Sequence, residues 1–70
     1  MPKAMIKNRI RALRFAHAEM TQQELADRAG CTRQTIVLLE QERYVPSLVL
    51  AIRIARIFGE PIDSVFTLED

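Results

Sequence analysis

The sequence predicts a single all-α domain of five short helices, and three observations support this fold class. The chain has 70 residues, of which 49% are apolar and 27% charged, as expected for one small globular domain. Apolar residues recur at helical spacing, and three Pro and two Gly divide these stretches into short segments. We therefore expect one domain over residues 1–70, stabilised by helix packing and by association with a second subunit.

The first two helices are predicted from a stripe and a cap. An apolar stripe at spacings of four, three and three predicts a helix over residues 7–17, and it consists of Ile6, Ile10, Leu13 and Ala16. Thr21 followed three residues later by Glu24 forms a capping box, so a second helix begins at Gln22. Gly30 suits the left-handed conformation that ends a helix.

The third helix follows after a short turn. Only Gly30 and Cys31 separate the end of the second helix from Thr32, which caps a helix running from Arg33 to about Gln41. Two helices joined by a three-residue turn that contains glycine form the helix-turn-helix pattern. This turn projects the first half of the third helix away from the body of the domain.

The last third of the chain predicts two more helices and a short strand. Ser47 caps a fourth helix that ends at Phe58, before Gly59. We expect this helix to be buried nearly all round, because apolar residues occupy most of its positions: Leu48, Leu50, Ala51, Ile52, Ile54, Ala55, Ile57 and Phe58. A fifth helix covers residues 62–66, and alternation in Phe66–Leu68 is compatible with a strand, for which residues 2–6 are a weak partner.

Charge is divided along the chain although the net charge is only +1. Residues 1–14 carry five basic side chains and no acid, and residues 43–56 carry three Arg and no acid. Residues 57–70 carry four acidic side chains and no base. Such segregation favours a polyanion on one side of the protein, although solvated helix faces would give the same pattern.

Several function classes are excluded by composition. One cysteine, Cys31, and one histidine, His17, cannot form a disulfide or a zinc cage within the chain. We expect Cys31 to fill space in the core and His17 to lie at the surface. No catalytic constellation is visible, so we expect no enzyme activity, cofactor or metal. Without a long apolar run or a signal peptide, we expect a cytoplasmic protein with no membrane partner.

The motifs resemble a known family. TQQELA at residues 21–26, GCTRQTI at residues 30–36 and Leu39-Glu40 are similar to the helix-turn-helix core of the Cro/C1-type (XRE) DNA-binding regulators. YVPSL at residues 44–48 and the following helix are similar to its very short members. The resemblance covers residues 6–68 and implies a five-helix lambda-repressor-like domain with a small antiparallel strand pair at the chain ends, near Lys3–Ile6 and Phe66–Leu68.

Residues in the third helix are the candidates for reading DNA bases. Arg33 can bond to the O6 and N7 atoms of guanine, and Gln34 to the N6 and N7 atoms of adenine. Thr32 caps the helix and is a further candidate for a thymine methyl contact. Val37 and Leu38 depart from the polar residues usual in the family and face outward; they suit thymine methyls or a protein interface, or they have no such role.

Other residues are predicted to bind phosphates or hold the structure. Gln22 lies in the first turn of the second helix, where free N–H groups attract a phosphate. The full set of phosphate candidates is Thr21, Gln22, Thr35, Gln41, Arg43, Tyr44, Arg9 and Arg11. Arg14 and Glu40 match a structural ion pair of the family, although the connection from Arg14 to Thr21 is one residue longer than usual. Glu42 replaces a common Gly, and Val49 a commonly charged residue.

The resemblance implies a sequence-specific transcriptional regulator, which we expect to be a repressor. A homodimer would place one recognition helix on each half of a palindromic operator, with half-sites about 34 Å apart. The predicted dimer interface comprises Ile62, Val65, Phe66 and Leu68. Two alternatives keep the same fold: an antitoxin that binds DNA and a toxin, and a helix-turn-helix module that binds another regulatory protein.

Overall fold

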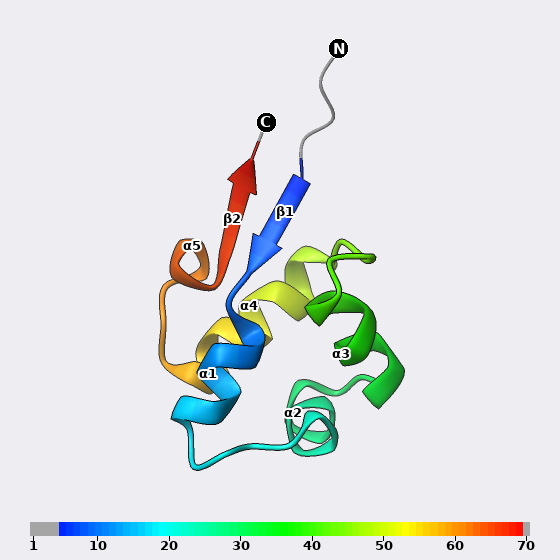
Figure 1. Ribbon diagram of the computed structural model, residues 1–70, viewed down its shortest axis with the longest axis vertical. Helices are drawn as coiled ribbons and strands as arrows, with labels where there is room; N and C mark the ends of the chain where they lie inside the picture. The colour runs from blue at the N-terminus through cyan, green and yellow to red at the C-terminus, as the bar shows by residue number, and fades with distance from the viewer. Residues whose placement is uncertain (1–4, 70) are drawn as a thin grey trace.

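The chain forms five short helices and one two-stranded antiparallel sheet (Figure 1). The structure is a computed structural model that describes residues 5–69. Its elements are β1 (Met5–Asn8), α1 (Ile10–Ala16), α2 (Gln22–Ala29), α3 (Arg33–Glu40), α4 (Leu48–Phe58), α5 (Ile62–Val65) and β2 (Phe66–Glu69). The predicted fold class is therefore confirmed, including the strand pair at the chain ends.

Side-chain and glycine caps set the helix boundaries. The Thr21 hydroxyl accepts a hydrogen bond from the Glu24 N–H at 3.0 Å, and the Glu24 carboxylate accepts one from the Thr21 N–H at 3.4 Å. Ser47 caps α4 in the same way at its Leu50 N–H, at 3.2 Å. Gly30 and Gly59 end α2 and α4 with φ angles of 74° and 67°, in the left-handed region that favours glycine. Each of these caps agrees with its prediction from sequence.

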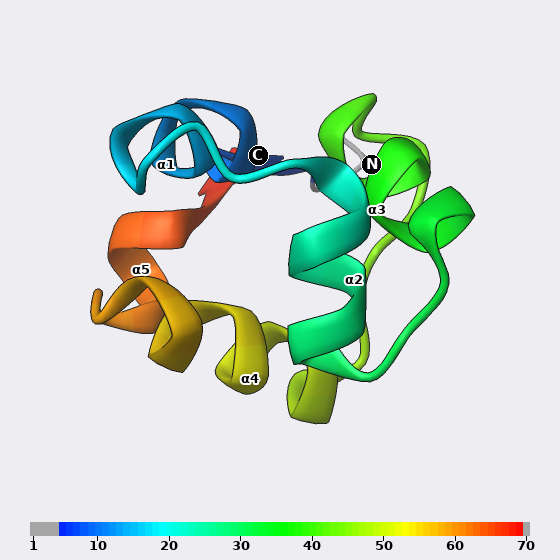
Figure 2. The same cartoon turned by 90° about the horizontal axis from the view of Figure 1, so that it is seen from below.

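The helices surround one hydrophobic core (Figure 2). Every helix contributes to it, and its fully buried large side chains are Ile10, Leu25, Ile36, Leu39, Ile54 and Val65. α2 packs against both α3 and α4, so the helix-turn-helix unit is joined to the rest of the core through α4. Helices of this length are marginal in isolation, so this packing supplies most of their stability.

The strand pair replaces the first turn of the predicted first helix. α1 begins at Ile10, and residues 7 and 8 belong to β1. β1 pairs with β2 in a register that places Ile6 opposite Leu68 and Asn8 opposite Phe66. Ile6 therefore belongs to the sheet and lines a hollow together with Leu48 and Ala51 of α4. Lys3 and Ala4 of the predicted strand lie outside the described residues.

α4 buries one face and exposes another, so the expectation of burial all round was wrong. The buried side consists of Leu50, Ala51, Ile54, Ala55 and Phe58. Leu48 is 69% exposed and Val49 is 60% exposed, and Ile52 is exposed as well. The core is too small to cover every apolar residue of this helix. An uncovered apolar face of this kind commonly marks an interaction surface.

The connection between α1 and α2 contains two consecutive residues in the left-handed region. Ala18 has a φ of 56° and Glu19 a φ of 53°. The turn is closed by the Met20 N–H, which donates to the Arg14 carbonyl at 2.9 Å. The extra residue noted in the sequence is thus accommodated by backbone conformations that are unfavourable for residues with a Cβ atom.

This turn predicts that Ala18→Gly stabilises the protein. Glycine has no Cβ atom and adopts the left-handed conformation without the steric cost that alanine has there. The substitution should therefore raise the free energy of unfolding by about 1 kcal/mol, measured by urea denaturation. Ala12→Gly is the matched control, because Ala12 is an exposed residue inside α1, and it should cost about 1 kcal/mol. A loss of stability in Ala18→Gly similar to that of the control would contradict the strain inferred at Ala18.

Candidate nucleic-acid interface

The helix-turn-helix unit consists of α2, the turn at residues 30–32, and α3. The Cys31 N–H donates to the Ala26 carbonyl at 3.0 Å, which closes the turn directly on the end of α2. The Arg53 guanidinium on α4 donates to the Ala29 carbonyl at 3.5 Å. The turn is therefore fixed to the body of the domain, and the first turn of α3 is carried at a defined angle.

The first turn of α3 presents exposed polar side chains. Arg33 and Gln34 are both exposed, as is Thr32. The Thr32 hydroxyl accepts from the Thr35 N–H at 3.3 Å and lies 3.0 Å from the Thr35 hydroxyl. The two threonines are thus engaged in capping the helix, whereas Arg33 and Gln34 extend into solvent. This geometry suits a helix whose N-terminal residues contact base edges.

Val37 and Leu38 lie less far outward than the sequence predicts. Both are half-buried on α3. Val37 lines a surface hollow of about 300 Å³ together with Gln22 and Gln41. Its side chain therefore belongs to the face that carries the N-terminus of α2. Leu38 lies in the last turn of α3, and its carbonyl accepts a hydrogen bond from the Arg43 N–H at 3.0 Å.

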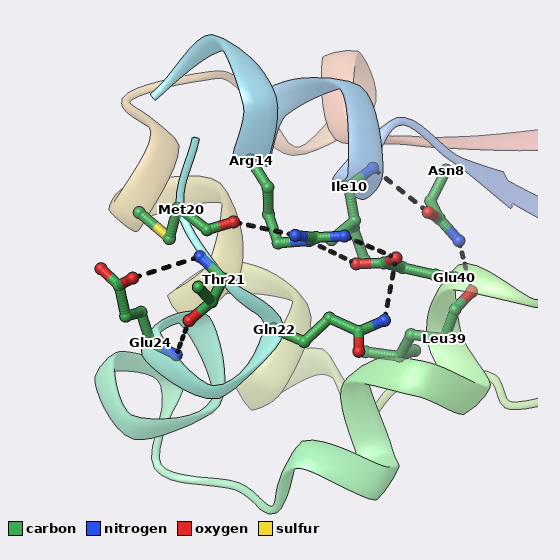
Figure 3. Close-up of polar contacts among 9 residues, drawn as sticks. All are labelled: Asn8, Ile10, Arg14, Met20, Thr21, Gln22, Glu24, Leu39 and Glu40. Atoms are coloured by element: carbon green, nitrogen blue, oxygen red, sulfur yellow. Dashed lines mark hydrogen bonds and ion pairs between the residues drawn. The ribbon is translucent and has the colours of Figure 1, made fainter. Parts of the chain in front are cut away.

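A buried ion pair joins α1 to α3 (Figure 3). The Arg14 Nε and Nη2 atoms donate to the two Glu40 carboxylate oxygens at 2.7 and 3.0 Å. The Arg14 Nη1 atom donates to the Met20 carbonyl at 2.8 Å. Both charged side chains are only 9% exposed. The pair therefore fixes α1, the α1–α2 connection and the end of α3 relative to one another, despite the longer connection.

Gln22 extends this cluster to the N-terminus of α2. Its Nε2 atom donates to the Glu40 carboxylate at 3.3 Å (Figure 3). An amide nitrogen carries two hydrogens, so one remains for a phosphate. The Glu40 carboxylate next to Gln22 would repel a phosphate, but the Arg14 guanidinium neutralises its charge. Thr21 is exposed beside it, with its hydroxyl used as the cap.

Asn8 is a structural residue that sequence reasoning missed. Its Nδ2 atom donates to the Leu39 carbonyl at 2.7 Å, and its Oδ1 atom accepts from the Ile10 N–H at 3.2 Å (Figure 3). One side chain therefore satisfies the start of α1 and a carbonyl near the end of α3. An Asn two residues before a helix was the available signal, but its contact with Leu39 depends on the strand pair.

The remaining phosphate candidates lie in two places. Gln41, Arg43 and Tyr44 are exposed in the segment that follows α3. Arg11 is exposed on α1, whereas Arg9 donates to the Ser64 carbonyl at 3.0 Å and is thereby drawn towards α5. The structure thus brings Arg11 beside Gln22 and Gln41 around one hollow, whereas Arg9 lines a second hollow with Arg11 and Phe15.

Glu42 shows how the turn after α3 tolerates a residue that is not glycine. It keeps the left-handed conformation, with a φ of 61°. Its carboxylate lies 3.5 Å from the Lys7 ammonium on β1. The Lys7 ammonium offsets part of the negative charge of Glu42, which would otherwise repel a phosphate bound at Arg43. Glu42 thus occupies a backbone conformation that favours glycine, the residue common at this position in the family.

The predicted dimer interface needs one correction. Ile62 and Leu68 are exposed, and Phe66 is half-buried. Val65 is fully buried in the core and cannot contact a partner. The residues at the start and end of this segment face outward because α5 turns directly into β2, which points Val65 at the centre of the domain.

Cys31 lies against the core and His17 at the surface, which agrees with their predicted places. Cys31 is half-buried and packs against the core, and burial raises the pKa of its thiol. His17 is exposed and lies edge-on to the Phe58 ring, with ring centroids 5.1 Å apart.

Over residues 5–69, no group of three or more His, Cys, Asp or Glu side chains is placed to hold a metal ion. None of the described helices is long and apolar enough to span a bilayer.

The fold and this surface define a helix-turn-helix protein. Residues 10–65 match the family model described as Helix-turn-helix. An uncharacterized HTH-type transcriptional regulator of Methanothermobacter thermautotrophicus is 58% identical over 52 residues, which cover 73% of this chain and 75% of the relative. Similar regulators are MJ0272 of Methanocaldococcus jannaschii, 43% identical, and YgzD of Bacillus subtilis, 40% identical; each match covers 93% of this chain and 97% of the relative. The chain belongs to the Cro/C1-type helix-turn-helix family.

The buried ion pair predicts a large effect of Glu40→Gln on stability. This change leaves the Arg14 guanidinium buried without its counter-charge, which should lower the free energy of unfolding by roughly 3 kcal/mol in urea denaturation. Glu42→Gln is the control, because the ion pair of Glu42 with Lys7 is much more exposed. Its loss should lower the free energy of unfolding by less than about 1 kcal/mol. Equal effects of the two changes would contradict the structural role assigned to Glu40.

Proposed function

We propose that the protein is a sequence-specific DNA-binding transcriptional regulator that acts as a repressor. The observation that carries this proposal is the first turn of α3, which holds Arg33 and Gln34 exposed on a rigid support. In the proposed complex these two side chains read base edges in the major groove. The relatives are named HTH-type transcriptional regulators, which supports a role in regulating transcription.

Phosphate contacts would orient the recognition helix. Gln22 at the N-terminus of α2 and Arg11 on α1 lie around one hollow beside α3. Arg43 and Tyr44 are exposed in the segment that follows the same end of α3. We propose that these groups bind phosphates of the DNA backbone beside the recognition helix. Such contacts fix position and orientation, and they leave sequence reading to Arg33 and Gln34.

This assignment predicts a loss of specificity in the double variant Arg33→Ala, Gln34→Ala. After operator selection in vitro, the variant should lose discrimination by roughly 1–3 kcal/mol for each base contact removed. Arg56→Ala is the control, because Arg56 is an exposed cation in the last turn of α4. A double variant that selects the same operator with the same discrimination would contradict the base-reading role of α3.

We also propose that the protein binds a palindromic operator as a homodimer, through an apolar face that is larger than the sequence predicts. Its centre is an apolar hollow of about 230 Å³ between β1, α4 and α5, and Ile6, Val45, Pro46, Leu48, Ala51, Ile62 and Phe66 line it. Around the hollow, Val45 is 67% exposed, Leu48 69% and Leu68 60%. In a two-fold dimer each subunit would use this same face, so the apolar residues of both subunits would be covered at once. Val49 is 60% exposed on α4 and does not line this hollow, so we assign it no role in the dimer.

The apolar face predicts that Leu48→Glu disrupts the dimer. In sedimentation at micromolar concentration, the native protein should be a dimer and the variant a folded monomer, because a buried unpaired carboxylate opposes association. Ala16→Glu adds the same charge at an exposed position of α1 and should leave the dimer intact. A native protein that sediments as a monomer would contradict the homodimer. A stable complex with a different protein on this face would favour the antitoxin or protein-binding alternative.

A further inference from the structure

Phe15 is an exposed aromatic residue to which the proposed function assigns no role. It lies in the last turn of α1 and is 54% exposed. The guanidinium carbons of Arg14 and Arg11 lie 5.4 and 5.8 Å from the centre of its ring. Arg14 is already bound to Glu40 and Met20, whereas Arg11 is exposed. The ring is thus held between a buried structural cation and one directed to solvent.

The position of Phe15 links it to the proposed DNA-binding face. It forms a wall of the hollow that also contains Arg11, Gln22 and Gln41. It also lines a neighbouring hollow of about 370 Å³, together with Thr21 and Arg33. Phe15 therefore lies next to the N-terminus of α2, where a phosphate would bind, and it shares a hollow with Arg33, the first residue of the recognition helix.

We propose that Phe15 packs against a deoxyribose of the DNA strand that Gln22 and Arg11 hold by its phosphates; this inference rests on the proposed function. The sugar is the least polar part of the backbone and lies between successive phosphates. An exposed ring beside two phosphate-binding groups is complementary to it, and covering the ring removes apolar area from water. The contact is independent of base sequence, because every nucleotide has the same sugar.

Arg11 lies next to this ring. A guanidinium near an aromatic ring is attracted by the negative face of the ring. Arg11 and the ring would then contact neighbouring parts of one strand, Arg11 a phosphate and the ring a sugar, and Arg11 keeps its phosphate contact without the ring. Glu19 also lines the second hollow, and its carboxylate repels a phosphate placed there. Glu19→Gln should therefore strengthen binding to all DNA sequences alike.

The salt dependence of DNA binding separates a sugar contact from an effect transmitted through Arg11. Phe15→Ala should weaken binding roughly fivefold on the selected operator and on unrelated DNA alike, since apolar area is lost. Its slope of log K against log salt concentration should equal that of the native protein, because no cation is removed. Arg11→Ala should instead reduce this slope by about one. Phe15→Leu keeps an apolar side chain and should retain most of the affinity.

Two results would overturn the proposal. One is native affinity in Phe15→Ala; the other is a reduced salt slope equal to that of Arg11→Ala, which would show that Phe15 acts only on Arg11. A direct readout uses Phe15→Trp, because the chain contains no Trp, so that the emission of this residue reports its surroundings alone. Its fluorescence should change on adding DNA, whereas that of Arg56→Trp, in the last turn of α4, should not. A native protein that binds no DNA at all would instead contradict the proposed function.

Discussion

The buried contact between Arg14 and Glu40 is the interaction on which the arrangement of the helices most depends. Arg14 uses its three nitrogens on the Glu40 carboxylate and the Met20 carbonyl. Through them α1, the α1–α2 connection and the end of α3 are held together. Glu40 also accepts from Gln22, so the N-terminus of α2 belongs to the same network. The angle of the recognition helix is therefore set by a charged cluster within an otherwise apolar core.

The strand pair also supports α3, through contacts that do not involve Arg14 or Glu40. Asn8 on β1 donates to the Leu39 carbonyl, and Lys7 lies near Glu42 in the following turn. The strand pair is thus fastened directly to the exit of the recognition helix. The apolar face borders this strand pair through Ile6 and Phe66. In the proposed homodimer, the surface that associates and the helix that reads DNA are consequently parts of one rigid unit.

The sequence was sufficient to predict features that depend on local chemistry. The capping residues Thr21 and Ser47 and the glycines at positions 30 and 59 determine where helices begin and end, and these boundaries agree with the structure. The exposed first turn of α3 followed from the same local reasoning. The resemblance to a known family identified Arg14 and Glu40 as a pair, which spacing alone does not do.

Features that depend on packing between distant segments were predicted less well. The sequence placed residues 7 and 8 on a helix, although pairing with β2 makes them part of a strand. It placed Val65 at an interface, although the turn from α5 into β2 buries it. It placed Leu48 in the core, because helical periodicity does not show how much of α4 the other helices can cover. Asn8 and Phe15 were overlooked for the same reason, since their neighbours come from other elements.

The most direct test of the proposed recognition by α3 is a titration of the isotope-labelled protein with its selected operator, followed by backbone amide NMR. We expect the largest chemical-shift changes at residues 32–34 and at residues 21 and 22, with small changes at residues 48–52 of α4. Changes concentrated on residues 48–52, with the start of α3 unaffected, would contradict the assignment of the DNA-binding face.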